Sequence, residues 1–255
     1  MTQVTKIPEH PWIIPDWPAP ERVRACATSR EGGVSDGAFA SLNLSDYVGD
    51  SDPAVGENRA RVRDKLALPA PPLWLHQVHG TGILAAHQLP ENSNPLEYDG
   101  SYTFSPGIVC AVQTADCLPV LLCDRRGHRV AALHAGWRGL AAGILEAGVQ
   151  AMVTDPDYLL AWLGPAIGPD AFEVGSDVYH AFVDADAETE KAFRRQSADK
   201  WLADIYQLAR RRLALAGVNA VYGGGFCTYN EATRFFSYRR DHTTGRMATL
   251  IWIQD

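Results

Sequence analysis

Three short motifs in the sequence carry side chains of the kinds that bind metals. They are HQVHG (76–80), ADCLPV (115–120) and HAGWRG (134–139). Their candidate donors His79, Cys117 and His134 would supply two imidazoles and one thiolate. His79 lies 38 residues before Cys117, and Cys117 lies 17 residues before His134. These separations are too long for a local zinc finger, but a catalytic metal site commonly collects its ligands from separate strands. The set suits zinc, with a fourth position left open for water or substrate.

A second histidine in the first motif, His76, competes with His79 for this role. The run LWLHQVH reads as a strand, in which positions three apart point to opposite faces. Only one of the two histidines can then face the site. His79 stands at the end of the run beside Gly80, whereas His76 lies inside it, so we assign His79 as the ligand and His76 as structural.

The same residues allow two other interpretations. Cys117 could be a thiolate nucleophile activated by His134, as in cysteine hydrolases. Alternatively, Cys117 could be a small buried hydrophobic residue, which we expect for Cys26, Cys110 and Cys123, and His134 a hydrogen-bonded core histidine. The choice depends on whether the ligand-type residues converge in space.

Composition limits the classes of partner. The chain has 255 residues and a net charge of −7, which argues against general binding to nucleic acid or to anionic membranes. The basic run 210–212 lies in a helical pattern and reads as a solvated face. No apolar run approaches the length of a membrane span. We therefore expect small-molecule partners, with no nucleic acid and no membrane.

Cysteine usage and domain organisation point to a cytoplasmic protein of one domain. The five cysteines form an odd set without a CxxC pair, which does not resemble a disulfide framework and favours a reducing compartment. No shift in composition divides residues 1–255. The prolines within residues 1–20 predict an extended N-terminal arm laid over this domain.

The apolar patterns predict a mixed α/β fold. Strands are expected at 21–29, 73–79, 82–86, 100–104, 108–113, 118–123, 129–134, 158–164, 219–225, 235–240 and 248–254. Helices are expected at 52–68, capped by Asp52, at 140–153 and within 200–217. A turn at 124–127 predicts an antiparallel hairpin. Because no regular βαβ alternation is present, we expect a largely antiparallel or mixed sheet with helices packed outside.

Six motifs together resemble those of a known family. In chain order they are LHQVHG, TADCLPVLL, HAGWRGL, WLGPAIGP, FEVG and FFSYRRDHTTGRMA. The sequence resembles the YfiH family, whose members are also called laccase-like polyphenol oxidoreductases, purine nucleoside phosphorylases and peptidoglycan editing factors. The resemblance implies a four-layer α/β sandwich related to toxin-type cysteine hydrolases. It also implies a metal-binding set that falls on His79, Cys117 and His134.

The resemblance further implies phosphorolysis of adenosine, inosine and methylthioadenosine, together with adenosine deamination, at an open zinc site. Phosphorolysis needs positive charge to hold phosphate, because arginine matches phosphate oxygens in pairs. The candidates for this role are Arg59, Arg138, Arg239, Arg240 and Arg246. Each could instead form a surface salt bridge. Glu173 could serve as an acid/base group or contact the purine, or it could form a structural ion pair.

Three classes of function compete at this point: a zinc-dependent purine nucleoside enzyme, a Cys117–His134 hydrolase that edits cell-wall precursors, and a non-catalytic binding protein. Copper-dependent polyphenol oxidation is disfavoured, because a blue-copper site and a trinuclear cluster together use about ten histidines. The chain has eight histidines and no His-x-His pair. Occupation of the same three ligands by a single copper ion stays open.

Overall fold

The computed structural model describes residues 12–89 and 96–255. A Pro-rich arm is predicted over residues 1–20, and its residues 1–11 lie outside the described residues. In the rest of that segment Trp12 is buried, and Ile13 exchanges backbone hydrogen bonds with Ala27. This part of the arm therefore lies against the first strand of the domain.

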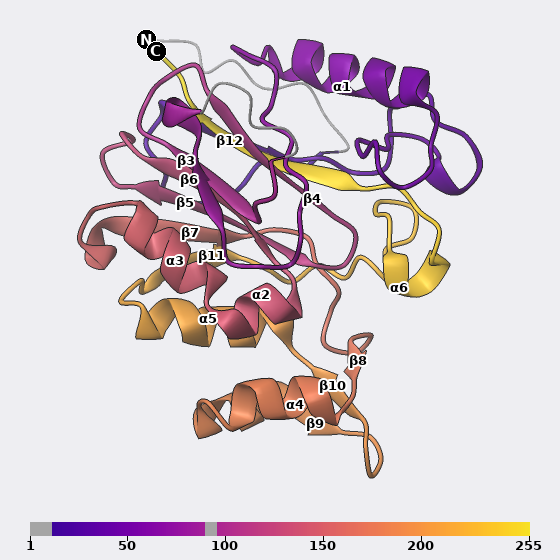
Figure 1. Cartoon of the computed structure of the whole chain (residues 1–255), viewed down its shortest axis with the longest axis vertical. Coiled ribbons are helices and arrows are strands. Elements are labelled where there is room, and N and C mark those ends of the chain that lie inside the picture. Colours follow the sequence, from indigo (N-terminus) through magenta and orange to yellow (C-terminus); the bar gives the residue numbers. More distant parts are fainter. Residues whose placement is uncertain (1–11, 90–95) are drawn as a thin grey trace.

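A six-stranded mixed sheet runs through the molecule (Figure 1). In spatial order its strands are β11 (Ala220–Gly223), β7 (Leu159–Leu163), β5 (Leu118–Asp124), β6 (Val130–Ala135), β3 (Gly100–Thr103) and β2 (Ile83–Ala85). The outermost pair at each edge is parallel and the other pairs are antiparallel. β5, β6 and β7 are buried along their whole lengths, which explains why their sequences are apolar except for Asp124 in β5 and His134 in β6. The predicted hairpin between β5 and β6 is confirmed.

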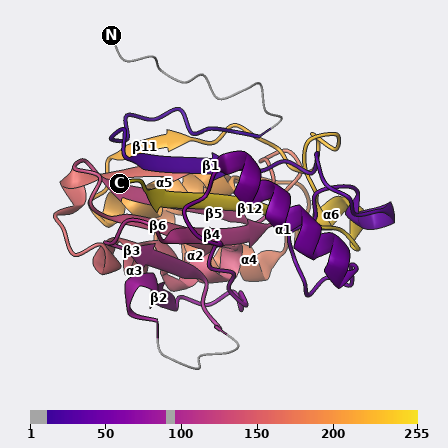
Figure 2. The same ribbon diagram turned by 90° about the horizontal axis from the view of Figure 1, so that it is seen from above.

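A second sheet packs face to face on the first (Figure 2). Its strands are β1 (Val23–Ala27), β12 (Met247–Ile253) and β4 (Val109–Thr114), all antiparallel to their neighbours. Helix α1 (Asp52–Leu66) covers the outer face of this sheet, where Val62 is buried in the same cluster as Leu250. The structure places the N-cap of α1 at Ser51, one residue before the predicted Asp52, with Pro53 in the first turn.

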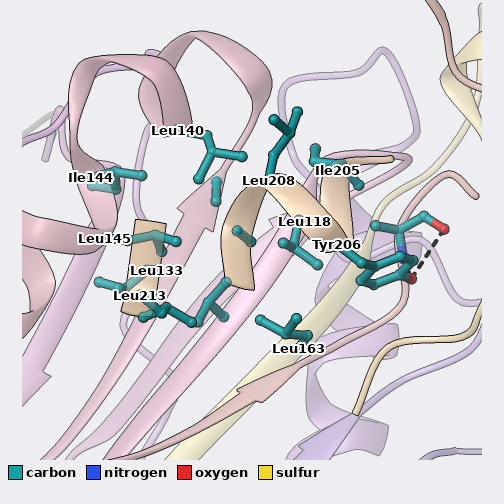
Figure 3. Packing of buried hydrophobic residues seen from close by; sticks show 14 of the residues in the cluster. Leu118, Leu133, Leu140, Ile144, Leu145, Leu163, Ile205, Tyr206, Leu208 and Leu213 are labelled. Atoms are coloured by element: carbon teal, nitrogen blue, oxygen red, sulfur yellow. Dashed lines mark hydrogen bonds between the residues drawn. The ribbon is translucent and has the colours of Figure 1, made fainter. Parts of the chain in front are cut away.

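Three helices cover the other face of the six-stranded sheet (Figures 1 and 3). They are α2 (Trp137–Ala142), α3 (Ile144–Ala151) and α5 (Ile205–Leu215). Leu118 and Leu133 from the strands are buried in one cluster with Leu140 and Ile144 from the helices. The single helix predicted at 140–153 is wrong, because Gly143 adopts φ +103 and breaks it in two. Glycine reaches this left-handed conformation without the penalty that other residues incur.

A small lobe projects from the main body below α2 and α5 (Figure 1). It consists of the antiparallel strands β8 (Glu173–Val174), β10 (Trp201–Ala203) and β9 (Phe193–Arg195), with helix α4 (Ser176–Val183) against them. The helical pattern predicted over 200–217 therefore begins with a strand. Helix α5 starts only after Asp204, whose side chain accepts a hydrogen bond from the backbone of Gln207 as an N-cap.

Two predicted strands do not form. At 235–240, Phe235 and Phe236 are buried in a separate cluster with Met247, and Ser237 caps the short helix α6 (Tyr238–Asp241). At 73–79 the described backbone makes isolated bridges rather than a strand. Short 3-10 helices complete the described elements at Gly37–Phe39, Ala86–Gln88, Pro156–Tyr158 and Ala187–Ala192.

The fold class predicted from the sequence, a mixed α/β domain with largely antiparallel sheets, is confirmed. The arginines at 210–212 do not form a free basic patch: Arg210 donates to backbone carbonyls, and the next two pair with Asp186 and Glu146. Within the described part of the chain, no helix is both long and apolar enough to cross a membrane.

Candidate metal centre

Strand pairing brings two of the predicted donors together. In the β5–β6 hairpin Leu118 pairs with Ala135. Cys117, which immediately precedes β5, therefore comes beside the end of β6, where His134 is the penultimate residue. His79 reaches the same place from the loop that precedes β2.

The three side chains converge on one point. The donor atoms of His79, Cys117 and His134 all lie within 4.8 Å of one another. The Cys117 Sγ atom is 3.9 Å from His79 Nε2, and the two imidazole rings meet edge to face with centroids 4.8 Å apart. Donors around a tetrahedral zinc ion are separated by about 3.3–3.7 Å, from bond lengths of about 2.0–2.3 Å. His134 is 3% exposed and His79 is exposed, so the site is closed on one side and open on the other.

Gly136 leaves the space that this convergence requires. A Cβ atom at this position would lie 2.9 Å from His79 Cδ2, 3.1 Å from Cys117 Sγ and 3.6 Å from His134 Cε1. Any larger residue would therefore push into the donor group from the side of the hairpin. The donor types and this clearance together fit a mononuclear site for zinc or copper.

A buried carboxylate that the sequence did not reveal contacts the segments of two of the donors. Asp99 is fully buried, and its Oδ1 atom is 2.8 Å from His134 Nδ1. The same carboxylate accepts the backbone N–H groups of Val78, His79 and Gly80 at 3.3, 2.9 and 2.6 Å. The Asp-Gly pair at 99–100 resembles an ordinary turn in the sequence, and neither the 35-residue separation from His134 nor its neighbours signal this role.

Proximity shifts the titration of the cysteine and of one histidine. Burial alone raises the pKa of the Cys117 thiol, but the charge of His134 and hydrogen bonds from both histidines outweigh burial and lower the pKa to about 6. Burial lowers the pKa of His134, but the Cys117 thiolate and the Asp99 carboxylate raise it to about 9. Between these values the metal-free pair is a thiolate and an imidazolium. The thiolate is the form of cysteine that binds metals and attacks electrophiles.

Asp116 ties the segment that carries Cys117 to the C-terminal part of the chain. Its backbone adopts φ +90, a region that residues other than glycine rarely enter. The carboxylate accepts hydrogen bonds from the Thr228 hydroxyl at 2.6 Å and from the Arg239 backbone N–H at 2.7 Å. The guanidinium of Arg239 in turn donates to the carbonyl of Glu173 at 2.7 Å. Two predicted substrate residues, Arg239 and Glu173, are thus linked to the cysteine segment.

The other predicted arginines differ in how fully they are engaged. Arg59 forms an ion pair with Asp46 at 3.1 Å. Arg138, in the first turn of α2, lies 4.5 Å from the centroid of the Trp137 ring. Arg246 donates to two carbonyls of its own turn. Among the residues that the structure describes, neither Arg138 nor Arg246 pairs with a carboxylate.

Arg240 and Glu173 both form ion pairs, the alternative considered from the sequence. Arg240 pairs with Asp241 at 2.7 Å and donates to backbone carbonyls around α6. The Glu173 carboxylate lies 3.7 Å from Lys200 on the projecting lobe. All three nitrogens of the Arg240 guanidinium are thus engaged within the chain, whereas Glu173 keeps an exposed carboxylate in a loose pair.

His76 lies apart from the convergent donors. The predicted reason, that a strand at 73–79 points His76 and His79 to opposite faces, is wrong. The run at 73–79 makes isolated bridges only, and at Gln77 the side-chain amide, not the backbone, exchanges hydrogen bonds with the backbone of Gln113 in β4. His76 is exposed, and its ring centroid lies 5.6 Å from that of Tyr47.

Comparisons with known proteins agree over nearly the whole chain. A family model described as multi-copper polyphenol oxidoreductase laccase matches residues 24–254. Purine nucleoside phosphorylase PA4543 of Pseudomonas aeruginosa is 55% identical over 245 residues, 96% of this chain and 99% of that protein. Purine nucleoside phosphorylase YfiH of Escherichia coli K12 is 55% identical over 241 residues, 94% of this chain and 98% of that protein. The crystal structure of protein NMB0706 of Neisseria meningitidis is 48% identical with a TM-score of 0.92, and the match covers 96% of this chain and 99% of that one. The chain therefore belongs to the YfiH family, whose model bears the polyphenol oxidoreductase description.

Proposed function

We propose that this chain is a zinc-dependent purine nucleoside phosphorylase. It would cleave adenosine, inosine and methylthioadenosine to the free base and the sugar 1-phosphate, with adenosine deamination as a second activity. The observation that carries the proposal is the convergence of His79, Cys117 and His134 at a site that is open on one side. Two relatives that are 55% identical over nearly the whole chain bear the name purine nucleoside phosphorylase, which supports it.

The chain's own residues would hold the metal through one thiolate and two imidazoles. Zinc favours this mixed donor set, and copper accepts it as well. When bound, zinc supplies Lewis acidity at the open position. His134 and its surroundings are buried, so this wall of the site excludes water, and the exposed His79 edge leaves an entrance for substrate.

Phosphorolysis places a dianion against the sugar. A phosphate oxygen forms a bond to C1′ of the sugar while the C1′–N9 bond breaks. The electron pair of the broken bond leaves with the purine, which takes up a proton. Arg138, Arg239 and Arg246 carry no carboxylate partner among the described residues, so their charge is available to orient phosphate. Arg59 is a weaker candidate because Asp46 already neutralises it. Glu173 is the candidate for contact with the purine or for its proton.

The test of the reaction class is turnover of inosine with and without inorganic phosphate, following hypoxanthine and the sugar product. We expect turnover to depend on phosphate and to release ribose 1-phosphate. Equal rates in both conditions, with free ribose as the product, would show hydrolysis and contradict the proposal. Formation of inosine from adenosine measures the deaminase activity separately.

Matched variants test the metal assignment. Purified protein should contain close to one metal ion per chain, and Cys117→Ala or His79→Ala should lose it. His76→Ala is the control, because His76 is an exposed histidine three residues away that lies outside the donor group. If His76→Ala abolishes metal binding while Cys117→Ala retains it, the ligand assignment is wrong.

A second candidate is a Cys117–His134 hydrolase that acts on peptidoglycan precursors, for example on a misincorporated amino acid. The observation in its favour is the hydrogen bond of 2.8 Å from His134 to the buried Asp99 carboxylate, since cysteine hydrolases orient the general base through a third residue of this kind. Chelation separates the two candidates. A hydrolase should stay active and be trapped covalently by an electrophilic substrate analogue without metal, whereas a metal enzyme should lose all activity.

A cytoplasmic location completes the proposal. All five cysteines are free thiols, which fits a reducing compartment. The partners would then be a purine nucleoside and phosphate, with no role for nucleic acid.

A further inference from the structure

The Asp99 carboxylate contacts the segments of two donors at once. It is 0% exposed and immediately precedes β3. One oxygen faces His134 Nδ1 and the His79 backbone N–H, and the other faces the Gly80 N–H at 2.6 Å. The Asp99 carbonyl also accepts the backbone N–H of His134 at 2.7 Å. A buried carboxylate with this many donors is satisfied only when both segments are in place.

The contact with His134 determines which ring nitrogen is available. A carboxylate oxygen can only accept, so Nδ1 must carry the proton in this hydrogen bond. The nitrogen left for the donor group is therefore Nε2. Histidine ligands in metal sites are commonly oriented and made more basic by a carboxylate in this way.

The contact with the His79 loop stabilises an unusual backbone. His79 adopts φ +61, a left-handed conformation that is uncommon for residues other than glycine and costs of order 1–3 kcal/mol unless the surroundings enforce it. The N–H groups of Val78, His79 and Gly80 all point at the Asp99 carboxylate. Successive N–H groups aimed at one anion form a nest, which a negative charge stabilises.

We propose that Asp99 is a positioning residue that orients both histidines of the site, acting through the ring of His134 and the backbone of His79. This inference rests on the metal-binding part of the proposed function and is independent of the nucleoside chemistry. Asparagine at this position would keep the volume, but its NH2 group would face one of the N–H donors that the carboxylate now accepts. Either the His134 ring or the His79 loop would then have to move.

The experiment compares Asp99→Asn with Asp124→Asn in the full chain. Asp124 is 3% exposed, accepts two backbone N–H groups, and ends β5 at the opposite end from Cys117. Cobalt(II) serves as the probe, with its affinity measured by competition with a chelator and its coordination by its absorption spectrum. We expect Asp99→Asn to weaken binding about 10- to 100-fold and to alter the spectrum, and Asp124→Asn to change neither. An Asp99→Asn variant with unchanged affinity and spectrum would overturn the proposal.

A measurement on the unaltered protein covers the case in which Asp99→Asn fails to fold. Long-range 15N–1H spectra of the zinc-loaded protein should show His134 protonated at Nδ1 and coordinated through Nε2. Coordination through Nδ1 would overturn the positioning role while leaving the metal site intact. Wild-type protein that binds neither cobalt nor zinc would overturn the metal site itself, and this proposal with it.

Discussion

Replacing Gly136 with alanine adds one methyl group at the point where the three donor side chains face one another. The new Cβ atom would lie 2.9 Å from His79 Cδ2 and 3.1 Å from Cys117 Sγ. Ordinary contact begins near 3.4 Å, so the His79 ring must retreat by about 0.5 Å and the thiolate by a few tenths of an ångström. Metal–ligand distances tolerate changes of only about 0.2 Å. We therefore expect metal affinity to fall on the order of 10- to 100-fold, the size of other disturbances just outside the ligand atoms.

The same substitution should change the stability of the metal-free protein little. The Gly136 backbone, at φ −62 and ψ 157, is accessible to alanine. Alanine is a poorer N-cap for α2, by up to about 1 kcal/mol, but it reduces the entropy of the unfolded chain, which restores about 0.4–1 kcal/mol. Because His79 is exposed, its ring can move outward at low cost. The free energy of unfolding should therefore stay within about 1 kcal/mol of wild type.

The assay combines metal competition with urea unfolding of the chelated protein. Gly56→Ala is the matched control, since Gly56 lies inside α1 with nothing within 4 Å of its added Cβ atom. That variant should be stabilised by about 0.5–1 kcal/mol and bind metal as wild type does. Wild-type metal affinity in folded Gly136→Ala would refute the reasoning, because it would mean that the donors do not meet beside Gly136 as they do here.

Three further outcomes follow from the same structure. In chelated protein, the rate of Cys117 alkylation should rise as pH passes through about 6 and level off before pH 8, because the pKa of the Cys117 thiol is depressed in the folded protein and the thiolate is present above it. A rate that rises only near the ordinary thiol pKa of 9.0 would contradict the ion pair with His134. Added zinc should block the reaction. Asp116→Ala should lower the free energy of unfolding by about 3 kcal/mol or more in a urea titration, since it loses two hydrogen bonds to a charged carboxylate that contribute about 1.5–3 kcal/mol each. Asp116→Asn should lower the free energy of unfolding by less. Leu133→Ala should lower the free energy of unfolding by about 2–5 kcal/mol, since this side chain is fully buried against the helices. It should leave metal stoichiometry unchanged. A loss of metal would mean that core packing also positions the site.

The sequence predicted the central strands because their signal is local. Runs such as 118–123 and 130–133 are apolar throughout, which is what burial on both faces of a sheet requires. Where the outcome depends on one backbone conformation or on a distant partner, the same reasoning failed. Gly143 divides a continuous helical pattern through a positive φ that its sequence neighbours do not announce. Phe235 and Phe236 have the composition of a strand, but they fill a separate pocket against Met247.

The donor group shows the same division. Cys117 and His134 stand at the ends of β5 and β6, and all three donors lie in long motifs, so residue type and motif were enough to nominate them although the strand predicted before His79 does not form. Asp99 could not be found in that way, because its role consists of contacts with residues 19 to 35 positions away, made inside the protein. A carboxylate that orients a ligand is identified from its contacts in the folded structure, whereas the ligands themselves can be identified from their residue types and motifs.

The polyphenol oxidoreductase description of the family can be weighed against the donors that this chain offers. Reduction of oxygen to water takes four electrons, and multi-copper oxidases collect them with a blue-copper site and a trinuclear cluster that together use about ten histidines. This chain has eight histidines, and residues 12–89 and 96–255 contain one convergent group of three donors. Two imidazoles and a thiolate also match a blue-copper site, so a single copper ion could bind there. A lone copper centre takes up one electron and has no second cluster to pass it to. Lewis-acid chemistry needs no such relay, and a single metal ion held by these three donors would be enough for it.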